Sequence, residues 1–145
     1  LNEAEATYNL TTGYVVPTDE FSVTFVAPPS GNVEISIQIP FYCGSSGAGD
    51  LNAGLSTANA TNGYAATESY HEKFIVDQSG RHGVDIVNFS WTLTGLTAGT
   101  SYERWVGFKS LSTTGTPNIK WGGNGSGESF EFVMKATALP DTIVT

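Results

Sequence analysis

Hydrophobic and polar residues alternate with a period of two along much of this chain. The clearest example is the segment 33–39, whose apolar positions are Val33, Ile35, Ile37 and Ile39 and whose polar positions are Glu34, Ser36 and Gln38. Successive side chains of a strand point to opposite faces of its sheet. This segment is therefore predicted to be a strand with one buried face and one solvated face.

Similar patterns predict further strands, separated by segments rich in Gly, Pro, Ser, Thr and Asn. The expected strands are 21–25, 33–39, 51–55, 70–77, 84–93, 102–111, 118–121 and 130–139. The inward positions of 84–93 are expected to be Val87, Phe89, Trp91 and Leu93. No segment shows the 3.6-residue period of an amphipathic helix. About eight short strands with turns between them predict an all-β chain, an antiparallel β-sandwich that is in practice a jelly roll.

The length of 145 residues suits one domain. We expect an N-terminal arm or short edge strand over residues 1–20, the jelly-roll domain over 21–140 and a C-terminal tail over 141–145. No internal repeat and no linker interrupts this order.

Charge and hydropathy exclude two classes of partner. The chain has a formal net charge of −8 and only six Lys and Arg residues, which are too few to follow a phosphate backbone, so we expect no nucleic-acid partner. No run of 18 apolar residues occurs, so we expect no membrane insertion. Charged residues make up only 14% of the chain, and uncharged polar residues supply the rest of its polarity.

No pattern of residues indicates catalysis or metal binding. Cys43 is the single cysteine and the histidines are His71 and His82, so neither a disulfide nor a clear ligand cluster is available. The adjacent carboxylates of Asp19 and Glu20 point to opposite sides of an extended chain, whereas glycoside hydrolysis needs two that face one another. The glycine-rich segment 122–127 lacks the lysine and the helix of a phosphate-binding loop. We therefore expect no enzyme activity, no cofactor and no metal.

Several segments together resemble the C1q/TNF-like jelly-roll domains of bacteriophage structural proteins. They are FVAPPSG (25–31) before the strand 33–39, AGLS (53–56), the corner LTGLTAGTSY (93–102) and the closing MKATALP (134–140). The resemblance implies a homotrimer on the virion surface that contacts other virion structural proteins, as a tail-fibre tip, a head fibre or a capsid decoration. It carries no catalytic residues. The corner also resembles fibronectin type III modules, so the alternative is an extracellular adhesion or carbohydrate-binding module.

Aromatic and amide side chains in or near loops are the candidates for carbohydrate binding, because an aromatic ring stacks on a pyranose face while amides bind its hydroxyls. The candidates are Trp121, Tyr64, Tyr42 and Asn124. For Trp121 the alternative is that the ring packs beneath its own loop.

Two expected strands carry apolar residues on both faces, which is typical of a subunit interface. Trp105 lies opposite the face that contains Phe108, and Ile75 lies opposite Phe74 and Val76. Trp105, Ile75 and Phe108 are therefore the candidates for the oligomer interface. The alternative is that the sandwich covers these side chains with its own loops.

Two functions remain open at this point. One is a receptor-binding or adhesion tip whose exposed loops contact a host-surface glycan. The other is a decoration protein whose arm 1–20 and outer faces contact shell proteins.

Overall fold

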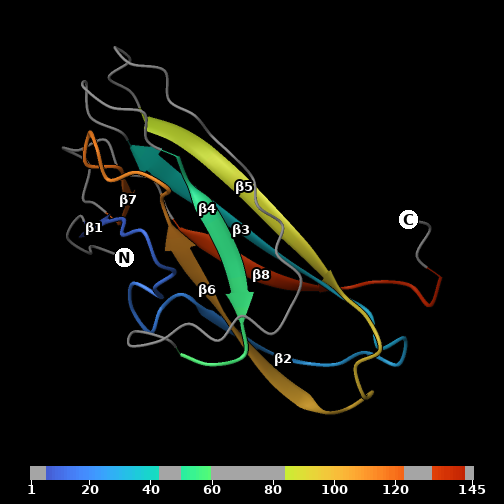
Figure 1. Cartoon of the computed structure of the whole chain (residues 1–145). Coiled ribbons are helices and arrows are strands. Elements are labelled where there is room, and N and C mark those ends of the chain that lie inside the picture. The colour runs from blue at the N-terminus through green and yellow to red at the C-terminus, as the bar shows by residue number, and fades with distance from the viewer. Residues whose placement is uncertain (1–5, 43–49, 60–83, 123–131, 143–145) are drawn as a thin grey trace.

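The computed structural model of the chain describes residues 6–42, 50–59, 84–122 and 132–142. These residues form eight strands in two antiparallel sheets that face one another (Figure 1). The predicted all-β sandwich is therefore confirmed, with a jelly-roll-like arrangement. Within the described ranges there is no helix long and apolar enough to cross a membrane.

The larger sheet is built around one long strand. It contains β1 (Ala6–Asn9), β3 (Val33–Tyr42), β5 (Val84–Leu93), β7 (Asn118–Trp121) and β8 (Val133–Ala138). On one side β3 pairs along its whole length with β5. On the other side β3 pairs first with β8, over 33–38, and then with β7, at 41–42. The smaller sheet has the order β2 (Ser22–Val26), β6 (Ser101–Lys109), β4 (Asn52–Ser56).

The core lies between the two sheets, where the alternation of the sequence placed it. The inward residues of β3 and β5 are all buried, and they are Val33, Ile35, Ile37, Ile39, Val87, Phe89, Trp91 and Leu93. The smaller sheet contributes buried Leu55, Val106 and Phe108. Each such side chain contributes roughly 1.5–3 kcal/mol when it is fully buried. The bounds predicted for 84–93 and 118–121 agree with β5 and β7, whereas the strand predicted over 70–77 lies outside the described residues.

The N-terminal segment joins the two sheets along one side of the sandwich. Its first part is β1, which pairs with β7 of the larger sheet. Further along, the Val15 amide donates to the Phe108 carbonyl of β6 at 3.1 Å, and Phe108 returns a bond of 2.9 Å. Leu10 and Val16 are buried in the core. The segment expected to be an arm or a short edge strand thus contributes an edge strand and two core side chains.

Glycine allows two connections to approach closely at one end of the sandwich. Gly31 has a φ of +66°, and a Cβ there would lie 2.5 Å from the Leu96 carbonyl oxygen. The Leu96 amide donates to the Gly31 carbonyl at 3.0 Å. The predicted corner 93–102 therefore folds back on the β2–β3 connection, and the Thr97 amide completes it by donating to the Tyr102 hydroxyl at 3.0 Å.

The chain that leaves β8 is held at the same end. The Leu139 amide donates to the Asn32 carbonyl at 2.9 Å, and the Ser30 hydroxyl donates to the Leu139 carbonyl at 2.7 Å. The side-chain amide of Asn32 donates to the Pro140 carbonyl at 2.9 Å. We call this set of contacts between 27–32, 96–100 and 139–141 the corner cluster.

Candidate functional site

The outer face of the larger sheet carries a groove with a volume of about 450 Å³. It runs across β8, β3 and β5, with β3 in the middle. Its lining residues are Glu34, Ser36, Ile37 and Gln38 from β3, Asn88, Phe89 and Ser90 from β5, and Val133 and Lys135 from β8. We call it the polar groove, because its side chains come from the solvated positions of the alternating strands.

Strand register arranges the outward side chains of β8, β3 and β5, in and beside the groove, in cross-strand rows. The rows, written in the order β8–β3–β5, are Thr137–Glu34–Thr92, Lys135–Ser36–Ser90 and Val133–Gln38–Asn88. Residues directly opposite one another on antiparallel strands have their Cβ atoms about 5 Å apart. Each row can therefore present up to three neighbouring groups to one ligand.

The side chains of the central strand are less exposed than those of the two flanking strands. Glu34, Ser36 and Gln38 on the central strand are half-buried, whereas Ser90 and Lys135 on the flanking strands are exposed. The central strand is thus the floor of the groove, and the side chains of β5 and β8 rise on either side.

Most of the polar side chains that line the groove have no hydrogen-bond partner among the described residues. The side chains of Glu34, Ser36, Gln38, Ser90 and Lys135 make neither a hydrogen bond nor an ion pair there. Together they offer hydroxyl, amide, ammonium and carboxylate groups, which include both donors and acceptors. Such groups remain available to a ligand that both donates and accepts hydrogen bonds.

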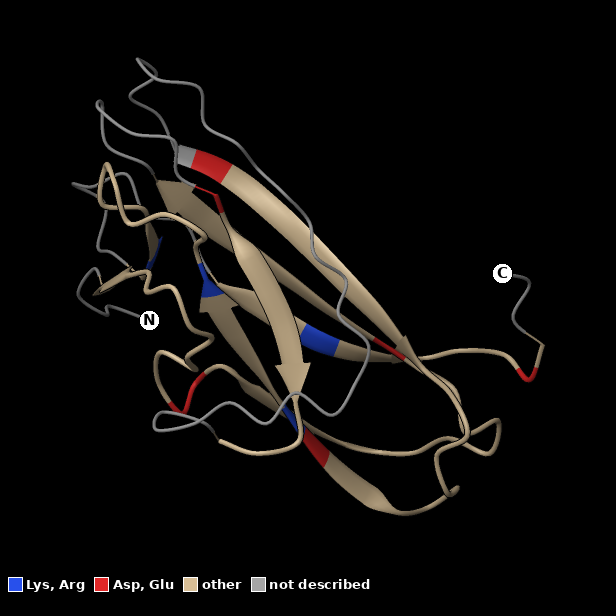
Figure 2. Ribbon diagram, viewed as in Figure 1, with Lys and Arg blue, Asp and Glu red and all other residues tan. Residues whose placement is uncertain are grey.

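The charge of the groove differs from that of the whole chain. One lysine and one glutamate line it, so its formal charge is zero, against −8 for the protein. Charged residues are sparse over both sheets (Figure 2). A neutral ligand rich in hydroxyl groups therefore matches the groove better than a polyanion.

Trp121 is a core residue in this structure. It is 8% exposed, and its ring packs edge-to-face against Phe21 with centroids 4.9 Å apart. Its indole Nε1 donates to Glu20 Oε2 at 3.3 Å. Most of the ring is therefore covered by the domain in this structure, and the loop that follows it lies outside the described residues. The four residues of β7 are too few for alternation alone to show which side of this strand is buried.

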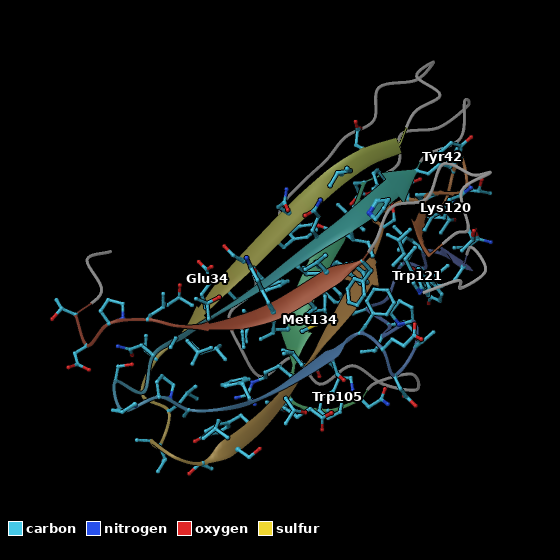
Figure 3. The ribbon with its side chains drawn as sticks, turned by 180° about the vertical axis from the view of Figure 1, so that it is seen from behind. Glu34, Tyr42, Trp105, Lys120, Trp121 and Met134 are labelled. Carbon is cyan, nitrogen blue, oxygen red and sulfur yellow. The ribbon has the colours of Figure 1, made fainter. Side chains whose placement is uncertain are left out.

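Tyr42 keeps its place as a candidate. It is half-buried, and its outward position on β3 places it on the same face as Gln38. The ammonium of Lys120 lies 5.4 Å from the centre of its ring, and both residues lie at the end of β3 away from Glu34 (Figure 3). Tyr64 and Asn124, the other carbohydrate candidates, lie outside the described residues.

The interface candidates separate onto two faces of β6. Phe108 is completely buried and packs edge-to-face against Phe21 at 5.5 Å, so it belongs to the core. Trp105 lies on the opposite face, as predicted, where it is half-buried and flanked in the sheet by Ser22 and Ser56. Ile75 lies outside the described residues.

A second polar cluster is enclosed by the fold. The carboxylate of Asp50 accepts from the Ser110 hydroxyl and from the Leu111 amide, each at 2.8 Å. The side-chain amide of Asn52 also donates to Asp50. This carboxylate is thus occupied by protein donors and ties the start of β4 to the end of β6. Over the part of the chain that the structure describes, no three His, Cys, Asp or Glu side chains form a group that could hold a metal ion.

Comparison with known proteins adds no relative. The chain matches no protein family, no curated protein and no solved structure. The resemblance to C1q/TNF-like phage domains therefore stays a prediction, and function is argued from the groove.

Proposed function

We propose that this chain is a non-enzymatic binding domain of a virion surface structure, and that it contacts a glycan through the polar groove. One observation carries the proposal: one groove is lined by five polar side chains that have no partner within the described part of the chain. Exposed polar side chains are common, but here they converge from three strands on a rigid sheet.

The chemistry of the groove favours a glycan over other ligands. Sugar hydroxyls donate and accept hydrogen bonds, as do the hydroxyl and amide groups of Ser36, Gln38 and Ser90. The volume of about 450 Å³ lies within the range of ligand sites, roughly 300–1,000 Å³. Tyr42 stands on the same face and supplies a ring on which a longer oligosaccharide can stack.

The set of carboxylates favours binding over hydrolysis. Glycoside hydrolysis in most families requires two carboxyl groups on either side of the bond, roughly 5–9.5 Å apart. Glu34 is the only carboxylate that lines the groove among the described residues. A single carboxylate serves well as an acceptor for sugar hydroxyls.

The assembly belongs to the same proposal. The resemblance favours a homotrimer, and the partly buried ring of Trp105, which also packs against the core, is the interface candidate on the described surface. Light scattering of the purified protein should then give a mass near three times 15.3 kDa. A mass of 15.3 kDa would contradict a stable trimer and leave glycan binding untouched.

Glycan binding is tested directly with a glycan array and a groove variant. Gln38→Ala combined with Ser90→Ala removes two unpartnered groups from neighbouring rows and should weaken binding at least tenfold, since each hydrogen bond contributes about 1 kcal/mol. Thr92→Ala combined with Thr137→Ala is the matched control, because both residues share the face but do not line the groove. Absence of binding to every glycan on the array would refute the proposal.

A further inference from the structure

The two ends of the polar groove differ in chemistry. At one end stand Glu34, Lys135 and Ser36, which are charged or hydroxylated. At the other end stands Gln38, and its cross-strand neighbour on β8 is Val133, which is 43% exposed. Large apolar side chains with this exposure are few among the described residues.

A second exposed aliphatic side chain lies beside the same amide. Ile86 on β5 is 43% exposed and pairs with Pro40, one outward position beyond Gln38 along β3. The amide of Gln38 is therefore flanked by Val133 on one neighbouring strand and, diagonally, by Ile86 on the other. Diagonal neighbours in a sheet lie about 7–8 Å apart, within reach of a ligand group between them.

We infer that the polar groove selects sugars that carry an acetamido group, with that group seated on Gln38, Val133 and Ile86. This inference rests on the proposed glycan binding and specifies its ligand. A secondary amide offers one N–H donor and one carbonyl acceptor, and the primary amide of Gln38 has the complementary acceptor and donors. The acetyl methyl then covers apolar surface of Val133 that is otherwise exposed to water, and Ile86, which lies beside the groove, offers a second apolar surface across β3.

The opposite end of the groove fixes the direction of the ligand. Ring hydroxyls of the same sugar or of its neighbour bind Ser36, Ser90 and Lys135, and Glu34 accepts from a hydroxyl at the far end. A sugar with a hydroxyl in place of the acetamido group keeps these contacts. It loses the contacts at Gln38 and leaves the two aliphatic side chains exposed.

The test uses pairs of sugars that differ only in the acetamido group. N,N′,N″-Triacetylchitotriose is compared with cellotriose by calorimetry, and methyl N-acetyl-β-galactosaminide with methyl β-galactoside by NMR titration. We expect the acetamido sugar of at least one pair to bind about tenfold more tightly, from one hydrogen-bonded amide and one buried methyl group. Val133→Thr and Gln38→Met should each reduce this ratio of affinities.

Controls separate this inference from the function on which it rests. Thr137 lies on the same face of β8 but does not line the groove. Thr137→Ser should therefore keep the full ratio of affinities between the two sugars of a pair. Affinities within twofold in both pairs would overturn the acetamido inference and leave glycan binding standing. If other glycans on an array bind and neither pair does, the acetamido inference is overturned and glycan binding stands. If no glycan on the array binds, both the inference and the proposed function are overturned.

Discussion

Polar side chains of the corner cluster form hydrogen bonds with the backbone, whereas those of the polar groove do not within the described residues. In the corner cluster, Ser30 and Asn32 donate to carbonyls of the chain that leaves β8. In the groove, the side chains of Ser36 and Gln38, on the strand that follows, have no hydrogen-bond partner among the described residues. Residues of the same chemical types thus hold chain connections together in one place, whereas in the other their side chains bind nothing within the described ranges.

This difference predicts different effects of substitution in the two regions. A polar group that closes a chain connection stabilises the folded state, and its loss leaves a carbonyl without its partner. A polar group on an open sheet face contributes little to folding, since water satisfies it equally well in the unfolded chain. Substitution should therefore lower stability at the corner cluster and ligand affinity at the groove.

Substitution of Trp121 should have the largest effect on stability. The result shows whether this ring supports the core or binds a sugar. Trp121→Ala removes a buried ring and should lower the free energy of unfolding by about 3–5 kcal/mol. Chemical denaturation measures this loss. Trp121→Phe keeps a ring against Phe21 and should lose much less. An alanine variant of full stability that no longer binds glycan would instead restore Trp121 as a binding residue.

Gly31 should show the next largest effect and tests how closely the corner cluster is packed. Gly31→Ala places a Cβ 2.5 Å from the Leu96 carbonyl oxygen at a φ of +66°, so the two connections must move apart. We expect a loss of about 3 kcal/mol from the clash and the left-handed conformation together. Gly95→Ala is the matched control, because Gly95 has a φ of +71° with nothing within 4 Å of its Cβ. Equal losses in both variants would show that conformation, and not close approach, sets the cost.

Substitution of Asn32 should cause a smaller loss of stability, through the corner cluster alone. Asn32→Ala removes the side-chain bond to the Pro140 carbonyl while the backbone bond to Leu139 remains. The expected loss is about 1 kcal/mol, the value of one hydrogen bond. Glycan affinity should not change. A parallel fall in affinity would mean that the two regions are coupled.

The groove itself should show the smallest effect on stability. Gln38→Ala with Ser90→Ala should change the free energy of unfolding by less than about 0.5 kcal/mol per site, as surface substitutions usually do, while binding falls at least tenfold. Thermal unfolding monitored by circular dichroism gives the first quantity, and the glycan titration gives the second. A large loss of stability would show that these side chains support the sheet and would weaken the contrast with the corner cluster.

The sequence by itself determined the class of fold and the sides of its main strands. Alternation in 33–39 and 84–93 separates inward from outward residues, because a strand turns successive side chains to opposite faces. The inward sets are buried as predicted. The sequence also indicated the corner 93–102, in which the Tyr102 hydroxyl accepts a hydrogen bond from the Thr97 amide.

Only the tertiary structure decided which outward residues are neighbours and which aromatic rings are exposed to solvent. The groove joins 34–38, 88–90 and 133–135, and the strand pairing that brings these distant segments together follows from packing of the whole sandwich. Trp121 shows the same limit: β7 is only four residues long, too short for alternation alone to identify its buried side. Local pattern determines which face a side chain takes, whereas its neighbours depend on register between strands far apart in the chain.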